Sequence, residues 1–354
     1  MAIVLVVTYK CNFRCVYCFE KGSYLLKKHM PMDILKKACN WCIDYVKRNY
    51  IETLHVTPFG GEPLLNFDAI KYILDFFSEH NFQEKEINFY MSTNGFLLSP
   101  EKARYLISKG LKSFQITLDG LPDIHNKRRS GGKDSFSIIW ENIINLVKLG
   151  GFVELLFVGD MENVDYFIPL IDFLKSQAKE LPLLLEHLRI QGTLTEPVEA
   201  CMERSKKYIL GKEIEIADKL LEGLKYAKES GFKICPPYYS NICLRQLYNG
   251  FLISIDGGIY KCYSAGGNPR YKIGNLDTPL ENIMIKANEW ADLKTWDDEC
   301  RDCYLFPLCR GGLCQYSAAQ FHNGEYGHKL CEKELITYTI KKALEYGLYE
   351  VEIF

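Results

Sequence analysis

The chain has 354 residues, with 43 Lys and Arg against 45 Asp and Glu, which gives a net charge of −2. A charge so near zero excludes a global electrostatic attraction to nucleic acid, and a hydrophobic fraction of 47% excludes a disordered chain. The 14 cysteines are too dilute for a small disulfide scaffold. The sequence contains no signal peptide and no apolar run of about 18 residues, so we expect neither export nor a membrane span. This composition indicates a cytoplasmic protein whose clustered thiols hold metal.

The first 200 residues alternate β-rich runs with amphipathic stretches. The predicted strands are 3–8, 53–59, 87–92, 113–118, 152–158 and 183–190, and the predicted helices are 32–48, 67–80, 100–109, 135–149 and 164–179. Six successive units of this kind predict a parallel sheet, either doubly wound or curled toward a barrel.

The pattern changes beyond residue 200. A charged helical stretch, 205–230, leads to a stiff Cys-Pro-Pro break at 235–237. A hairpin with a glycine turn is predicted at 251–262, followed by loops rich in cysteine and a final helix at 332–346. At about 150 residues per domain, the length fits one large and one smaller domain.

Three cysteines follow the first strand on one short loop. Cys11, Cys15 and Cys18 form a CxxxCxxC run at the end of a barrel strand where chemistry is usually placed. Structural zinc takes four ligands, whereas an iron–sulfur cluster held by three thiolates keeps one iron open. The alternative is a zinc loop completed by His29 or His55.

This run resembles the defining motif of the radical S-adenosylmethionine (SAM) enzymes, in which an aromatic residue, here Tyr17, precedes the third cysteine. The resemblance implies a partial (β/α)6 TIM-like barrel and a [4Fe–4S] cluster on the three cysteines. SAM would chelate the fourth iron, and its reductive cleavage would give a 5′-deoxyadenosyl radical that abstracts a substrate hydrogen.

Further segments at strand ends match the SAM-binding elements of that family in order. The GGEP element would receive the SAM amino group, and an arginine would meet the SAM carboxylate through its planar fork. The implied SAM-binding residues are Tyr17, Gly60, Gly61, Glu62, Pro63, Ser92, Asn94, Gln115, Thr117, Asp119 and Arg129.

The C-terminal cysteines resemble the SPASM domain of peptide-modifying radical SAM enzymes, which holds two auxiliary [4Fe–4S] clusters. The resemblance assigns Cys300, Cys303, Cys309 and Cys331 to a distal cluster and Cys243, Cys262 and Cys314 to a proximal one. Four residues separate Cys309 from Cys314, where the family usually has three. The fourth proximal ligand is either Cys235, which we favour slightly, or an open site for a substrate thiolate.

The expected organisation is a radical SAM barrel at 1–204, a helical bridge at 205–235, a SPASM domain with a β-hairpin and loops at 236–335, and a C-terminal helix at 336–354. Cys39 and Cys42 lie on the apolar face of the first helix, so we expect core packing there. Cys201 receives no role. No leader-recognition domain precedes the first strand, which suggests a separate recognition protein or recognition by the barrel surface.

The resemblance implies a maturase that installs a thioether or another cross-link in a ribosomally synthesised peptide. Its partners would be the precursor peptide and an external donor of the flavodoxin or ferredoxin type, in an anaerobic or microaerobic host. The alternative is an anaerobic sulfatase maturase, which chain length favours. Those enzymes place an Asp directly after the hairpin cysteine, where Tyr263 stands here. A phenol is a poor base, although Asp256 or His322 could substitute. A remote alternative is a non-catalytic zinc scaffold, which would be colourless and free of iron.

Overall fold

A computed structural model describes residues 1–22, 28–79, 86–132, 134–195, 202–237, 243–291, 296–309, 314 and 331–349. Cys201, His322 and the four residues between Cys309 and Cys314 lie outside the described residues.

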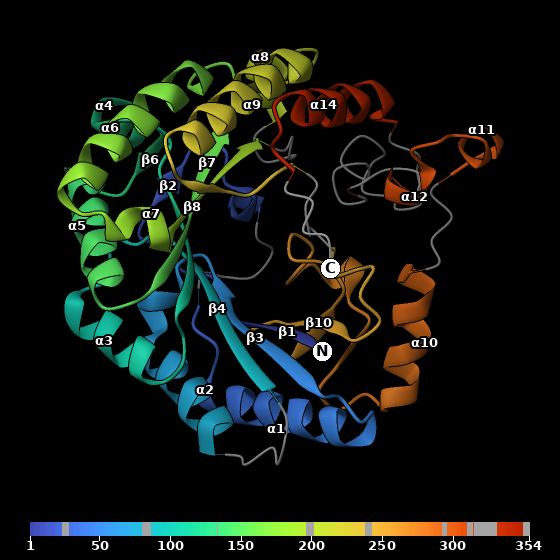
Figure 1. Ribbon diagram of the computed structural model, residues 1–354. Helices are drawn as coiled ribbons and strands as arrows, with labels where there is room; N and C mark the ends of the chain where they lie inside the picture. The colour runs from blue at the N-terminus through green and yellow to red at the C-terminus, as the bar shows by residue number, and fades with distance from the viewer. Residues whose placement is uncertain are drawn as a thin grey trace.

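A ten-stranded sheet forms the centre of the molecule, and its middle strands run parallel and curve into a partial barrel (Figure 1). In spatial order the strands are β12 (Gly274–Asn275), β11 (Gly258–Tyr260), β10 (Gly250–Ile253), β1 (Ala2–Thr8), β3 (Thr53–Gly60), β4 (Glu86–Thr93), β5 (Ser113–Thr117), β7 (Phe152–Gly159), β8 (Leu188–Leu194) and β9 (Lys233–Ile234). A separate small sheet pairs β2 (Arg14–Cys15) with β6 (Arg129–Ser130).

Helices cover the outer face of the sheet (Figure 1). They are α1 (Met32–Arg48), α2 (Phe67–Glu79), α3 (Pro100–Ser108), α4 (Pro122–Arg128), α5 (Ser135–Lys148), α6 (Phe167–Glu180), α7 (Leu183–His187), α8 (Met202–Tyr208) and α9 (Glu213–Glu229). The C-terminal part adds α10 (Leu280–Ala291), α11 (Asp298–Arg301), α12 (Phe306–Cys309) and α14 (Lys333–Glu345), the last of which packs on α9. Short 3₁₀ turns include η1 (Phe19–Gly22), η2 (Pro63–Asn66), η3 (Val164–Tyr166) and η5 (Pro269–Tyr271).

The structure confirms the predicted parallel α/β fold, with three differences. The predicted strand 183–190 is wrong in its first half, because residues 183–187 form α7 and only Leu188 onward is strand. Residues 122–128 form the helix α4 rather than a loop, since Pro122 fits the first helical turn. The predicted hairpin exists, but β10 also pairs in parallel with β1 and so extends the barrel sheet.

Local chemistry explains why the elements begin and end where they do. The side chain of Ser99 accepts a hydrogen bond from the Lys102 N–H and caps α3, whose first residue is Pro100. Gly110 follows α3 with φ of +88°, a conformation that glycine adopts without steric cost. The cap of α5 is Asp134, whose side chain accepts a hydrogen bond from the Ser137 N–H.

Alternate residues of the central strands face opposite sides of the sheet. Ile116 packs toward α5, and Ile190 is equally buried on the helix-covered side. Between these buried positions, Gln115, Glu154 and Gln191 are partly exposed and face the inner side. The barrel therefore has an apolar outer layer beneath its helices and a polar inner wall.

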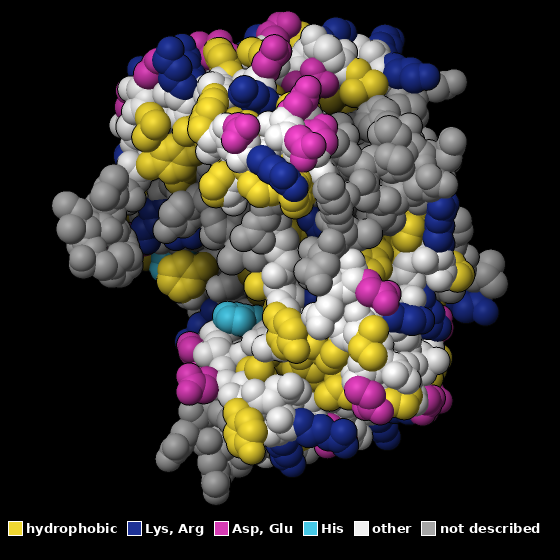
Figure 2. Space-filling view, turned by 90° about the vertical axis from the view of Figure 1, so that its right-hand side faces the viewer, with side chains coloured by type: hydrophobic (Ala, Val, Ile, Leu, Met, Phe, Trp, Pro, Cys, Tyr) yellow, Lys and Arg dark blue, Asp and Glu magenta, His cyan; other side chains and the backbone are white. Residues whose placement is uncertain are grey.

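Cys39 and Cys42 are fully buried on the inner face of α1, which confirms that they belong to the core. None of the 13 described cysteines forms a disulfide. No helix in the described part of the chain is long and apolar enough to cross a membrane. On the face shown in Figure 2, basic and acidic side chains are interspersed over the described surface, as the small net charge leads one to expect.

Candidate active site

The CxxxCxxC loop follows β1 and is held to α4 and β6 by backbone bonds. In the small sheet, Cys15 pairs with Arg129, and the Val16 N–H donates to the Arg128 carbonyl at 2.9 Å. The Phe13 N–H donates to the Cys11 Sγ at 3.3 Å. These contacts fix the conformation of the loop.

Cys15 lies close enough to Cys11 and Cys18 to affect the ionisation of those two thiols. Burial raises the pKa of Cys11 and raises that of Cys18 to about 12, and the neighbouring thiol Cys15 adds to both effects. Metal binding would displace these protons, because only thiolates bind iron. No group of three Cys, His, Asp or Glu side chains among the described residues is arranged to hold a single metal ion. An iron–sulfur cluster needs a different geometry from a single metal ion, because its cysteine ligands bind separate iron atoms.

The GGEP element lies against the cysteine loop. A Cβ on Gly60 would come within 1.9 Å of the Thr8 carbonyl oxygen, and one on Gly61 within 2.7 Å of the Lys10 carbonyl oxygen. The Gly61 N–H also donates to the Thr8 carbonyl. Side chains are thus excluded at both positions, because the two backbones approach so closely.

Glu62 is fully buried and connects the ends of β3 and β4. Its Oε1 accepts from the Leu64 N–H at 3.0 Å and the Thr93 hydroxyl at 2.8 Å, and its Oε2 accepts from the Asn94 N–H at 2.7 Å. Burial raises the pKa of this carboxyl, and the three hydrogen bonds oppose that effect. Pro63, also buried, begins η2 directly after it. Through these bonds Glu62 holds the end of β4 and the residues that follow it, and Glu62 also belongs to the predicted SAM site.

Asn94 reaches back to the cysteine loop. Its Nδ2 donates to the Asn12 Oδ1 at 2.9 Å, while its Oδ1 accepts from the Phe96 N–H. The Asn12 Nδ2 is buried and has no hydrogen-bond partner. A buried donor without a partner is costly, so a ligand that accepts a hydrogen bond here would be stabilised.

The predicted SAM contacts Ser92 and Gln115 lie on the inner wall and connect to a third residue that sequence reasoning missed. The Ser92 hydroxyl donates to the Gln115 Oε1 at 3.3 Å, and the Gln115 Nε2 donates to the Glu154 Oε1 at 2.8 Å. The three residues are direct neighbours in register across β4, β5 and β7, and Arg189 follows on β8. A hydroxyl, an amide, a carboxylate and a guanidinium therefore form one polar row. Only the strand register, which sequence does not show, reveals this row.

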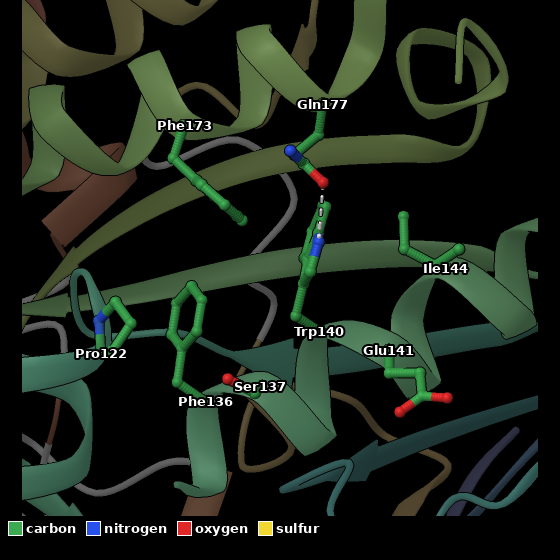
Figure 3. Close-up of a pocket in the computed structure, with 8 residues that line it drawn as sticks. All are labelled: Pro122, Phe136, Ser137, Trp140, Glu141, Ile144, Phe173 and Gln177. Atoms are coloured by element: carbon green, nitrogen blue, oxygen red, sulfur yellow. Dashed lines mark hydrogen bonds between the residues drawn. The ribbon is translucent and has the colours of Figure 1, made fainter. Parts of the chain in front are cut away.

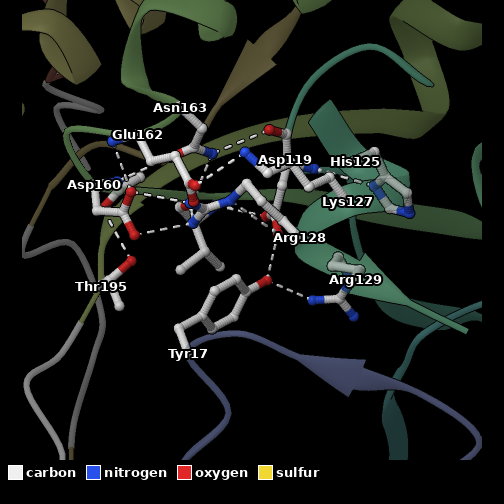
Figure 4. Close-up of polar contacts among 12 residues, drawn as sticks. Tyr17, Asp119, His125, Lys127, Arg128, Arg129, Asp160, Glu162, Asn163 and Thr195 are labelled. Carbon is white, nitrogen blue, oxygen red and sulfur yellow. Dashed lines mark hydrogen bonds and ion pairs between the residues drawn. The ribbon is translucent and has the colours of Figure 1, made fainter. Parts of the chain in front are cut away.

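Thr117 and Asp119 stand at the carboxyl end of β5, and both are buried. Asp119 accepts from the Tyr17 hydroxyl at 2.6 Å and from the Val158 N–H at 3.3 Å, and its own N–H donates to the His125 Nδ1 (Figure 4). Burial raises the pKa of Asp119, and the nearby guanidinium groups lower it in opposition.

The adjacent arginines Arg128 and Arg129 have different surroundings. Arg128 is 1% exposed and donates to Asp160 at 2.9 and 3.2 Å and to Glu162 at 3.0 Å, and Arg204 bridges the same two carboxylates (Figure 4). Buried charges of this kind are stable only when they are paired.

Arg129 is 8% exposed and donates through Nη1 to the Tyr17 hydroxyl at 2.6 Å. Its Nε is buried without a hydrogen-bond partner. The electrostatic neighbours of its guanidinium include Cys15. A guanidinium with free N–H donors beside the cysteine loop fits the carboxylate expected there. The three thiols, the two unpartnered donors and the glycine cradle are therefore compatible with a cluster and SAM.

The described C-terminal cysteines lie in several parts of the fold, and their assignment to two clusters stays a prediction. Cys243, Cys262 and Cys314 are electrostatic neighbours. Cys300, Cys303 and Cys309 follow one another on α11, α12 and the turn between them, and Cys331 is exposed just before α14. The electrostatic neighbours of Cys235 are Glu154 and Arg189 on the inner wall.

A cavity of about 450 Å³ lies on the outer layer between α5 and α6. Phe136, Trp140 and Phe173 line it, and the Trp140 Nε1 donates to the Gln177 Oε1 at 3.2 Å (Figure 3). Its walls are helices on the outer side of the sheet, so it is separate from the polar inner wall.

Residues 5–174 match the model of the radical SAM superfamily. This part of the chain is a radical SAM domain. The whole chain is 24% identical to the cysteine-type anaerobic sulfatase-maturating enzyme of Clostridium novyi (strain NT), over 91% of this chain and 90% of that protein.

Solved structures agree on the fold. Native anSMEcpe with bound AdoMet and Cp18Cys peptide superposes with a TM-score of 0.75 at 19% identity, covering 97% of this chain and 96% of that one. Streptococcus suis SuiB bound to its precursor peptide SuiA has a TM-score of 0.66 at 16% identity, with 94% and 75% covered. Radical SAM enzymes use a [4Fe–4S] cluster and SAM, so this chain is an enzyme with those cofactors.

Proposed function

We propose that this radical SAM enzyme is a peptide maturase that installs a thioether or another cross-link in a ribosomally synthesised peptide. Cys11, Cys15 and Cys18 would hold the cluster, and Arg129 would bind the SAM carboxylate. When bound, the cluster and SAM supply a 5′-deoxyadenosyl radical that abstracts a hydrogen from substrate carbon. The chain's own contribution is to position SAM and the peptide and to bind the electron-accepting groups.

The observation that carries the proposal is the polar inner wall beneath the SAM site. Ser92, Gln115, Glu154 and Arg189 lie in one row, and all four keep some exposure although they face inward. No ion pair within 4.0 Å joins Glu154 to Arg189 in the described part of the chain. The Glu154 carboxylate can accept from the N–H groups of a peptide main chain and the Arg189 guanidinium can donate to its C=O groups, while the neighbouring Ser92 and Gln115 would contact SAM.

The C-terminal cysteines support a second part of the proposal. Seven of them would hold two auxiliary [4Fe–4S] clusters, with Cys235 either completing the proximal cluster or leaving an iron open for a substrate thiolate. The position of Cys235 beside Glu154 puts it next to the wall that the peptide would face. These clusters would accept the second electron of the oxidation.

Tyr263 favours cross-linking over formylglycine formation. It directly follows Cys262, where sulfatase maturases place a carboxylate, and its ring packs on Phe59 at a centroid distance of 5.3 Å. Asp256 is no ready substitute, since it accepts from the Gly258 N–H in the hairpin turn and lies 3.5 Å from Lys272.

Formylglycine formation on a sulfatase is the second candidate, because the Clostridium novyi relative matches nearly end to end. In that case the inner wall offers Glu154 as the carboxylate that replaces the missing Asp. The substitution Glu154→Gln would then abolish aldehyde formation, whereas a cross-linking enzyme would lose peptide affinity.

The experiment is anaerobic reconstitution followed by mass spectrometry of two peptides. The first is the product of any small cysteine-rich reading frame found beside this gene, and the second is a sulfatase segment with a central cysteine. Loss of two hydrogens with a fragment-resistant link supports the proposal. An aldehyde in place of the thiol supports the second candidate. Colourless protein with zinc and no iron, where about twelve irons per chain are expected for three clusters, contradicts both.

The remaining partners follow from this chemistry. We propose a flavodoxin or ferredoxin-like donor for the reducing electron and a separate protein that recognises the peptide leader. We also propose a reducing cytoplasm as the compartment, which the absence of disulfides among the described cysteines supports.

A further inference from the structure

We propose that the Tyr17 hydroxyl is a positioning group that fixes the Arg129 guanidinium for the carboxylate of SAM, and thereby links the cysteine loop to SAM binding. The inference depends on Arg129 binding SAM and is independent of which peptide the enzyme modifies. Its geometry is drawn in Figure 4.

The direction of the two hydrogen bonds at Tyr17 is fixed by chemistry. A phenol has one proton, and Asp119, being a carboxylate, can only accept it, at 2.6 Å. The lone pair of the same oxygen then accepts from the Arg129 Nη1, also at 2.6 Å. The Tyr17 hydroxyl therefore donates a hydrogen bond to the buried Asp119 carboxylate and accepts one from the buried Arg129 guanidinium.

Asp119 is a rigid anchor for this connection. It is fully buried, and its second oxygen accepts from the Val158 N–H on β7. Its backbone N–H donates to His125 on α4. The Arg128 Nε of α4 also lies 3.8 Å from the Asp119 carboxylate. Because Asp119 is held from β7 and α4, the Tyr17 oxygen has one favourable position.

The Tyr17 ring is held from its face as well. The Arg128 guanidinium lies 5.3 Å from the ring centroid, and Asp160 and Glu162 hold that guanidinium in place. Arg128 thus orients Tyr17, and Tyr17 orients Arg129. Two arginines that are adjacent in the sequence therefore contact different parts of Tyr17, one the ring face and the other the hydroxyl.

Arg129 depends on this contact more than an ordinary buried arginine would. Within the described part of the chain, the bond to Tyr17 is the hydrogen bond that its guanidinium makes, and its Nε has no partner. The guanidinium also lies 6.0 Å from the centroid of the Phe13 ring, and the bond to Tyr17 keeps its remaining N–H donors in a defined plane for a bidentate acceptor. Without that contact the guanidinium would have to be ordered when SAM binds.

The test is Tyr17→Phe, with Tyr105→Phe as the matched control. Tyr105 also donates to an aspartate, Asp75, at 3.2 Å, but on the outer helices. Iron content shows whether each variant loads its cluster, and equilibrium dialysis with SAM alone measures affinity without any peptide. We expect Tyr17→Phe to bind SAM about 10-fold more weakly with normal iron content, which is the size of one charge-assisted hydrogen bond. Tyr105→Phe should match the wild type.

Two further measurements separate positioning from general damage. The electron paramagnetic resonance spectrum of the reduced cluster should change on SAM addition in the wild type and change less in Tyr17→Phe. In a double-mutant cycle with Arg129→Lys, the two losses should not add, because Tyr17 acts through Arg129. If Tyr17→Phe fails to load iron, Asp119→Asn decides in its place, with a loss of affinity expected.

An affinity for Tyr17→Phe within about twofold of the wild type overturns the inference, as does an additive cycle. If the wild-type protein binds SAM but makes no product from any peptide, the proposed function is contradicted, whereas the inference about Tyr17 is still decided by the SAM affinities of the variants.

Discussion

Replacing Arg128 with methionine tests whether the buried charge network holds the α4 region in place. The side chain is 1% exposed and contacts Asp160 and Glu162, which are 0% and 21% exposed. Methionine has a similar length, so the change removes the charge with little loss of volume. Asp160 would keep the ion pair with Arg204 at 2.7 Å and the hydrogen bond from the Glu162 N–H at 2.9 Å.

The magnitude follows from the cost of leaving a buried charge without its partner, about 3–5 kcal/mol. For 354 residues, the entropy of unfolding near the midpoint is about 0.7 kcal/mol per kelvin. Arg128→Met should therefore lower Tm by about 4–7 °C. Arg204→Met should cost less, because Arg204 is 17% exposed and Arg128 continues to pair both carboxylates.

The assay is anaerobic thermal unfolding of the iron-loaded protein, with the exposed Arg48→Met on α1 as the control for removing an arginine. The reasoning predicts the order Arg128→Met, then Arg204→Met, then Arg48→Met close to the wild type. It would be refuted if Arg128→Met melted within about 1 °C of Arg48→Met, since the network would then contribute nothing measurable.

Three more predictions concern burial and close contact. Burial lowers the pKa of His125 to about 3. Because the pKa is lower in the folded state, stability is lost as the pH falls below the unfolded value of about 6.5, and thermal scans should show the wild type losing about 1.4 kcal/mol more than His125→Gln between pH 7.5 and 5.5. Equal losses in the two proteins would contradict this prediction. Gly60→Ala should yield protein without iron by metal analysis, because its Cβ would overlap a β1 carbonyl, whereas Gly150→Ala, which has open space, should load normally at a cost of about 1 kcal/mol. Cys39→Ala and Cys42→Ala should retain full iron, and a loss of iron would show that this CxxC pair does more than pack.

The sequence predicted the elements with strong periodicity and missed those that depend on distant contacts. Helix α1 begins and ends at the predicted residues because its apolar positions recur at helical spacing. The leucine run at the start of α7 carries no such period, and a short apolar run fits strand or helix equally. Pro182 at its N-cap position was the available signal.

The sequence motifs indicate which residues belong to the candidate site, but they do not show how the side chains are arranged in space. The cysteine loop and the glycines were identified from spacing, and the structure puts them in backbone contact. The family resemblance assigns Arg129 and not Arg128 to SAM, and the structure adds a physical difference between these two buried arginines. Arg128 pairs with Asp160 and Glu162, whereas the hydrogen bond of the Arg129 guanidinium goes to the Tyr17 hydroxyl. Glu154 had no local motif, because its importance comes from cross-strand register.

The parallel pairing of β10 with β1 has a consequence for synthesis of the chain. Strand β1 is almost entirely apolar, lies between β3 and β10, and leads directly into the cysteine loop. Until residues 250–253 emerge from the ribosome, one edge of β1 has no partner, and an apolar edge strand readily pairs with other chains. The half-made barrel is therefore the species most in need of a chaperone, and a truncation before β10 should aggregate even though all three cluster cysteines are present.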